Sequence, residues 1–152
     1  MTDINGKHLE LPEYIAEYLC DLLGINTGSS VFIYSHGTNI MDAICRRNPK
    51  ALYNAKNQAK ESINEPLDRA VLCIPFSDNI DIGTVQTMYE TLESGGMLVG
   101  LVNLSLFYTN NGTVTDFANF LIANNATIKD LPKDAFTEIG EDVNACMIKI
   151  IK

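Results

Sequence analysis

One histidine stands where it could take part in acid–base chemistry. His36 is followed directly by Gly37, and an imidazole in a loop titrates near neutral pH, so a general-base role is one hypothesis. No Asp or Glu lies in the same short segment to orient the ring, since Asp42 comes one and a half helical turns later. We therefore interpret His36 as a polar loop residue.

Two carboxylates three residues apart could act as a catalytic pair or as part of a metal site. They are Asp78 and Asp81, and no third ligand is close to them in the sequence. A divalent cation needs more oxygen ligands than this pair supplies. We expect these residues to cap a helix near Thr84 instead, because Asp is among the favoured capping residues.

The four cysteines do not form a metal-binding pattern. There is no C-x-x-C pair and no histidine nearby to complete a zinc site. Free cysteine is among the residues most often buried. We expect buried free thiols and no metal, and the residues concerned are Cys20, Cys45, Cys73 and Cys146.

The charge balance argues against an autonomous nucleic-acid binder. The chain has 11 Lys and Arg against 19 Asp and Glu, a net charge of -8. Binding to phosphates needs clustered basic residues. The only concentration here is Arg46-Arg47 with Lys50, Lys56 and Lys60 after it, which could contact nucleic acid or form a solvated helix face. We favour the solvated face and expect no direct nucleic-acid binding by the isolated chain.

The length predicts a single domain, residues 1–152. With 46% hydrophobic residues the chain can bury one core but is short for two. The longest uncharged stretch, Ser94–Thr115, is interrupted by Gly and Asn and does not resemble a membrane span. The start, MTDINGKHLE, has no secretory signal pattern. We expect a cytoplasmic protein without membrane contact.

Helical and strand periodicities alternate along the chain, which predicts an α/β fold with a mostly parallel sheet. We expect helices at Pro12–Leu23, at Ile40–Arg47 with Asn39 as cap, at about Gln58–Ile63, around Val85 to Leu92 with a stop at Gly95-Gly96, and after a Thr115 cap. The expected strands are Val31–Tyr34, Ala51–Asn54, Ala70–Ile74, Met97–Asn103 and Ala145–Ile151.

Three segments, in order, resemble the class I methyltransferase fold of the N6-adenine DNA methyltransferases, especially the catalytic subunits of restriction and modification systems. The first is LPEYIAEYLCDLLGINTGSSVFIYSHGTNIMDAI, similar to a Thr-Pro-led helix, the first strand and the cofactor loop. The second is DRAVLCIPF with TMYETLESGGMLVGLVN, similar to the strand bearing the Asn/Asp-Pro-Pro-aromatic motif and to the helix, Gly-Gly turn and strand after it. The third is FANFLIANNATIKDLPKDAFTEIGEDVNACMIKIIK. The resemblance implies a Rossmann-like methyltransferase fold with helices on both sheet faces and an antiparallel last strand.

The resemblance also implies a loop for S-adenosylmethionine after the first strand. The acidic residue of the family is replaced by Ile33, and Gly37 is the one family glycine that remains. Asn39 can adopt the left-handed conformation where a second glycine would stand. The matching positions imply a weakened cofactor site formed by Tyr34, Ser35, His36, Gly37 and Asn39.

The catalytic motif departs further, since the four matching residues are Cys73-Ile74-Pro75-Phe76. In the family, the first side-chain carbonyl and the next backbone carbonyl orient the adenine amino group. Cys73 offers only a weakly accepting sulfur. Phe76 keeps the aromatic ring on which a base could stack, although a Phe beside Pro75 is more often part of core packing.

The middle of the chain is shortened relative to the family. The segment Asn48–Asp68 is too short for two strand–helix units, and no segment remains for a target-recognition domain. Asn54 matches the acidic residue that binds the cofactor ribose, although a polar loop role is more common for Asn.

These departures lead us to expect a catalytically inactive, methyltransferase-like protein that acts as a binding or regulatory protein. It could take the place of a modification subunit in an oligomer, or offer a DNA-like acidic face. One alternative is an active small methyltransferase that uses S-adenosylmethionine on another substrate. Another is a module that binds a different nucleotide at the strand ends.

Overall fold

The computed structural model describes residues 10–35, 37–55, 63, 65–75, 80–103, 112–131, 135–136 and 144–152, with only the backbone for 112–115. Its helices are α1 (Glu13–Leu23), α2 (Asn39–Cys45), α3 (Ile82–Thr91) and α4 (Gly112–Ala123). Its strands are β1 (Ser30–Ser35), β2 (Ala51–Asn54), β3 (Leu67–Ile74), β4 (Leu92–Asn103), β5 (Thr127–Asp130) and β6 (Ala145–Ile151). The five expected strands are found, as are the expected helices apart from the one at Gln58–Ile63. The predicted fold class is confirmed.

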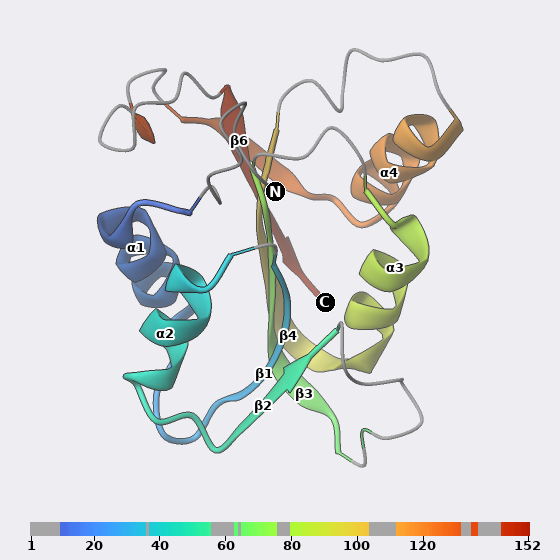
Figure 1. Ribbon diagram of the computed structural model, residues 1–152. Coiled ribbons are helices and arrows are strands. Elements are labelled where there is room, and N and C mark those ends of the chain that lie inside the picture. The colour runs from blue at the N-terminus through green and yellow to red at the C-terminus, as the bar shows by residue number, and fades with distance from the viewer. Residues whose placement is uncertain are drawn as a thin grey trace.

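A single six-stranded sheet, in the order β2-β1-β3-β4-β6-β5, forms the centre of the molecule (Figure 1). The pairs β1–β2, β1–β3 and β3–β4 are parallel, whereas β6 runs antiparallel to both of its neighbours. The predicted first strand lies between β2 and β3, and the predicted last strand is antiparallel. Both expectations are confirmed.

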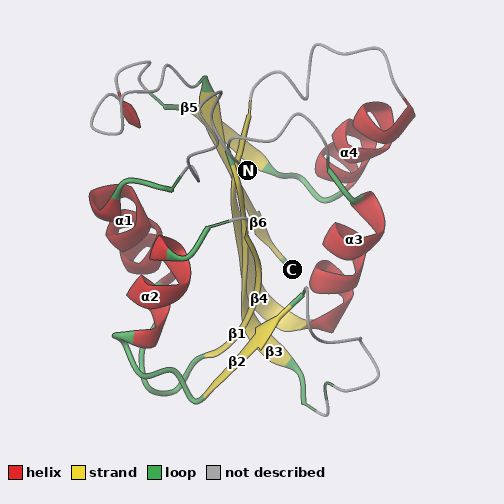
Figure 2. Cartoon of the chain, in the orientation of Figure 1, coloured by secondary structure: helices red, strands yellow, loops and turns green. Residues whose placement is uncertain are grey.

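Helices cover both faces of the sheet, with α1 and α2 on one side and α3 and α4 on the other (Figure 2). Successive residues of β1 therefore enter opposite cores: Val31 and Ile33 face α1 and α2, while Phe32 faces α3 and α4. A strand buried on both faces is an unbroken apolar run, as the sequence of β1 indicated.

Several predicted helix boundaries are wrong. The second helix ends at Cys45 rather than at Arg47. Asn39 is the first residue of α2 rather than its cap, because the amides at this end are bound by a carboxylate distant in sequence. Thr115 lies inside α4, which already begins at Gly112. The pair Gly95-Gly96 does not end α3, since Leu92 is already extended and the glycines belong to β4.

Gly95 instead provides an irregularity in β4. It has a φ of +87°, in the region that side-chain-bearing residues rarely adopt. Its amide donates to the carbonyl of Lys152, and the amide of Lys152 donates to the carbonyl of Gly96. Two glycines can thus serve a strand as well as a helix end, which the local sequence did not distinguish.

Few residues separate β2 from β3, and several of them lie outside the described part of the chain. β2 forms one edge of the sheet, and the chain reaches β3 without a further described strand. The weak helix expected at Gln58–Ile63 lies almost wholly outside the described residues, and Ile63, which is described, belongs to no helix or strand. None of the helices in the described part of the chain has the length and apolar character that a bilayer crossing requires.

Candidate functional site

The connections of the sheet define one place where a ligand crevice is expected. From β1 the chain crosses through α2, on one face, to β2; from β3 it crosses through α3, on the other face, to β4. The chain therefore leaves two adjacent parallel strands in opposite directions, and open α/β sheets bind ligands at the carboxyl ends of such strands. Here Ser35 and Cys73 are paired neighbours at those ends.

The turn after β1 is held by a side chain. The hydroxyl of Ser35 accepts from the amide of Gly37 and donates to its carbonyl, both at 3.1 Å. Ser35 itself is buried. This local bonding fixes the start of the loop that the sequence predicted to hold a cofactor, although His36 lies outside the described residues.

Glu10 occupies this loop, and sequence reasoning missed it. Its carboxylate accepts from the amide of Thr38 at 2.9 and 3.1 Å, from the Thr38 hydroxyl at 2.9 Å and from the amide of Asn39 at 3.2 Å. A Cβ on Gly37 would lie 2.6 Å from the carboxylate, so only glycine allows this close approach without a shift. The partners are separated by 28 residues, and no local pattern links them.

Two further predicted cofactor residues also contact the protein itself. The side-chain amide of Asn39 donates to the Leu11 carbonyl at 2.7 Å and so anchors the segment that carries Glu10. Tyr34 packs on the opposite face of the sheet, against the core under α3 and α4. Burial and the nearby charge of Asp81 raise the pKa of the Tyr34 phenol. Tyr34 therefore does not belong to the loop surface formed by Ser35, Gly37 and Asn39.

Asn54 lies at the expected edge of the sheet. It is the last residue of β2 and is paired with Ile33 of β1, so it stands one strand away from the loop. Ile33, at the position of the family's acidic residue, is completely buried. The position that would supply a charge in the family thus forms part of the core.

Cys73 is a buried thiol with no accepting carbonyl. It is 3% exposed and packs in the core under α1 and α2. Burial, with a smaller contribution from the charge of Glu10, raises the pKa of this thiol to about 12. The carbonyl of Pro75 accepts from the side-chain amide of Asn103 at 3.0 Å. Phe76 lies outside the described residues.

The remaining predictions on single residues have mixed outcomes. Asp81 accepts from the amide of Thr84 and caps α3, as expected, while Asp78 lies outside the described residues. Cys20 and Cys146 are buried free thiols, but Cys45 is exposed because it ends α2 on the solvent side. No cluster of metal-ligating side chains occurs among the described residues.

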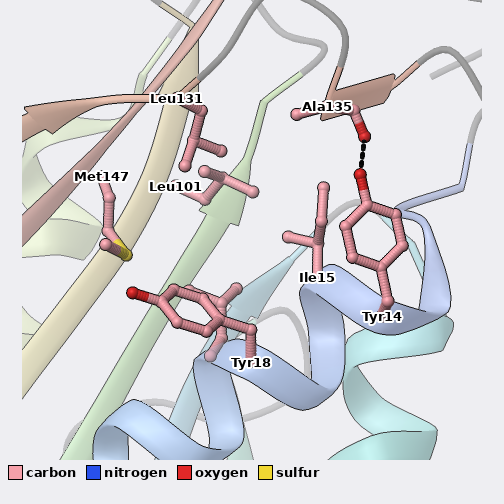
Figure 3. A pocket seen from close by; sticks show the side chains of 8 residues that line it. Tyr14, Ile15, Tyr18, Leu101, Leu131, Ala135 and Met147 are labelled. Carbon is pink, nitrogen blue, oxygen red and sulfur yellow. Dashed lines mark hydrogen bonds between the residues drawn. The ribbon is translucent and has the colours of Figure 1, made fainter.

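An apolar pocket of about 510 Å³ lies between α1 and the sheet (Figure 3). We call it the tyrosine pocket, and it is lined by Tyr14, Ile15, Tyr18, Leu19, Leu101, Leu131, Ala135 and Met147. Tyr14 donates a hydrogen bond to the carbonyl of Ala135, and the ring of Tyr18 extends toward Met147. Both tyrosines are apolar in character at helical spacing in α1, yet they are 54% and 46% exposed.

The basic pair after α2 is matched by carboxylates of α1. Arg46 lies 2.6 Å from Glu17 and 3.4 Å from Glu13, and Arg47 lies 3.1 Å from Glu17 and 2.5 Å from Asp21. Arg46 and Arg47 therefore form a partly solvated, ion-paired surface that joins α1 to α2, whereas Lys50 pairs with Glu65 at 3.4 Å.

Replacing Glu17 by Gln should flatten the acid side of the stability curve. The two arginines lower the pKa of Glu17 below its usual value of 4.5. A carboxyl whose pKa is lower in the folded state stabilises the protein above its unfolded-state pKa and loses this effect as the pH falls through the folded value. Urea unfolding between about pH 3 and 7 measures this, with exposed Glu93→Gln as control. An unchanged acid-side decline in the Glu17 variant would contradict the assignment.

The described residues at the strand ends fit poorly to S-adenosylmethionine, the cofactor that the sequence resemblance implies. The loop donors already bind a carboxylate of the chain, and the acidic position of β1 is a buried isoleucine. β2 is the edge strand of the sheet, and no further strand is described beyond it. Ser35, Gly37 and Asn54 stand at positions that the resemblance implies for the cofactor, but none of them carries a charge.

Solved structures with the same fold are methyltransferases. The M protein of the type I restriction enzyme EcoKI has a TM-score of 0.68 and 14% identity, over 95% of this chain and 44% of that one. A Listeria monocytogenes protein assigned to the class I S-adenosylmethionine-dependent methyltransferases has a TM-score of 0.60 and 15% identity, over 100% and 62%. The Bacillus cereus O-methyltransferase, solved with S-adenosylhomocysteine, has a TM-score of 0.57 and 10% identity, over 95% and 83%.

The sequence itself matches no protein-family model and no curated protein. The chain spans less than two thirds of the first two structures, 44% of the EcoKI subunit and 62% of the Listeria protein. At these identities the likeness concerns the fold. The chain has the Rossmann-like fold of the class I methyltransferases, a fold that it shares with type I modification subunits.

Proposed function

We propose that this chain is a methyltransferase-like protein that transfers no methyl group and acts as a binding or regulatory protein through a protein contact. The observation that carries the proposal is Cys73, because a buried, protonated thiol stands at the position where the family presents a carbonyl. Sulfur is a weak acceptor and cannot hold an amino group in a fixed orientation. The occupied loop beside it adds support.

The surface of α1 around the tyrosine pocket is the contact that we propose. Exposed tyrosines are enriched among the residues that dominate binding energy at protein interfaces, and here two of them border an apolar hollow. Glu13, Glu17 and Asp21 lie on the same helix, where they are ion-paired with Arg46 and Arg47. The partner surface should therefore carry an apolar projection that fits this hollow.

The net charge of -8 favours a protein partner that itself binds nucleic acid, since such proteins carry basic surfaces. An acidic fold copy could take the place of a modification subunit in an oligomer, or present negative charge as DNA does. A second copy of this chain is the other possible occupant. Because each copy has a net charge of -8, two copies repel each other, and self-association is less favourable at low salt.

A double variant, Tyr14→Ser with Tyr18→Ser, should lose the contact. Truncating a central interface tyrosine commonly costs about 2 kcal/mol or more, a loss of about thirtyfold in affinity. The test is capture from the native host with the wild type and the variant, and then light scattering of the recovered complex. The matched control is Ile122→Ser, because Ile122 is 75% exposed but lies on α4, across the sheet.

Salt dependence separates the two parts of the contact. Exposed charges are screened beyond about 10 Å at 0.1 M salt, so the electrostatic part should weaken as salt rises while the apolar part remains. A monomeric protein that recovers no partner and binds S-adenosylmethionine tightly would contradict the proposal. That outcome would favour the alternative of a small active methyltransferase.

A further inference from the structure

The carboxylate of Glu10 is bound as a ligand would be. It receives hydrogen bonds from two backbone amides and one hydroxyl, and these donors lie within the two consecutive residues Thr38 and Asn39. Bonds from several neutral donors to one ionised acceptor are among the stronger hydrogen bonds in proteins. These donors lie at the start of α2, which follows β1 after a short loop.

The residue that follows Glu10 is fixed in place. Leu11 is 3% exposed and belongs to the core under α1 and α2, and its carbonyl accepts from the side chain of Asn39. Gly37 leaves room for the carboxylate to approach the backbone. The occupied loop is therefore a built contact in which the buried Leu11 side chain and Asn39 determine where the Glu10 side chain reaches.

We infer that the Glu10 carboxylate is an internal occupant of this loop and keeps an amino-acid carboxylate, such as that of S-adenosylhomocysteine, from binding there. A second carboxylate would find the amides of Thr38 and Asn39 already engaged and would meet a like charge at the same place. The inference rests on the proposed absence of methyl transfer, and it assigns a separate physical cause to the loss of the cofactor.

The test is calorimetric titration of the full chain with S-adenosylhomocysteine, using the wild type, Glu10→Ala and Glu10→Gln. A site that its own chain occupies most of the time has an apparent affinity lowered by the fraction that is open. Glu10→Ala should therefore bind at least about tenfold more tightly than the wild type, with Glu10→Gln in between. The matched control is Glu13→Ala, which removes the same charge from α1 and should bind like the wild type.

A second measurement tests the contact without any ligand. Gly37→Ala should force the flexible end of the Glu10 side chain to move, because the new Cβ would lie 2.6 Å from the carboxylate. The melting temperature of the wild type should fall because this shift weakens the hydrogen bonds from Thr38 and Asn39. The same substitution should cost much less in the Glu10→Ala background. Equal losses in the two backgrounds would show that the carboxylate does not lie in the loop in solution.

Equal affinity of the wild type and Glu10→Ala for S-adenosylhomocysteine, whether tight or undetectable, would overturn the inference. Neither result bears on the missing carbonyl at Cys73. The proposed absence of methyl transfer is therefore tested separately, by an assay of methyl incorporation. Tighter binding by Glu10→Ala without methyl transfer would support both.

Discussion

Replacing Gly100 by alanine should lower the free energy of unfolding by about 1–3 kcal/mol, the usual range for overpacking a buried site. Gly100 of β4 is paired with Ile148 of β6, and a Cβ at Gly100 would lie 2.7 and 2.9 Å from two side-chain atoms of that isoleucine. Both residues are buried. Urea unfolding of the wild type and the variant measures the loss.

The register of the two strands can be tested with a double-mutant cycle. In an Ile148→Ala background, which itself costs about 2–5 kcal/mol, the Gly100 substitution should be nearly neutral because the crowding atoms are gone. Gly28→Ala, at an exposed turn, is the control and should change stability by about 0.5 kcal/mol or less. Additive losses at Gly100 and Ile148 would contradict the antiparallel pairing of β4 with β6 in this register.

The inner strands of the sheet were predictable from the sequence because they are apolar on both faces. The run from Val31 to Tyr34 and the segment Ala145–Ile151 stand between polar or turn-forming residues, and both are strands. The pair Gly95-Gly96 carried no such information, since glycine ends helices and also permits irregular strands. Local pattern thus determined which elements form, but not where one of them ends.

The sequence predicted where the candidate site lies, but it did not predict which residues contact one another there. The resemblance placed Ser35, Gly37 and Cys73 near one another, and the structure brings them to adjacent strand ends. Glu10 could not be found in the same way, because its partners lie 28 and 29 residues away and the bonds depend on the folded chain. The exposure of Tyr14 and Tyr18 depends on which elements pack against α1. Helical periodicity indicates the apolar face of a helix but not the elements that cover it.

Adenine N6 methylation by this chain should be slower than in an active enzyme of the resembled family by on the order of a hundredfold or more, the usual cost of losing one orienting contact in a preorganised site. The physical reason is Cys73, whose buried thiol has a pKa of about 12 and stays protonated at neutral pH. Cys73→Asn alone should remain inactive if the loop is held by Glu10, and the combination with Glu10→Ala is the informative comparison.

The most direct test of the account is methyl incorporation from labelled S-adenosylmethionine into unmodified DNA by the purified wild-type chain, with an active adenine methyltransferase assayed in parallel. The account predicts incorporation at the level of a sample without protein, over the concentration range in which the active enzyme saturates. Robust incorporation by the isolated chain would contradict it, because neither Cys73 nor the occupied loop would then prevent the reaction.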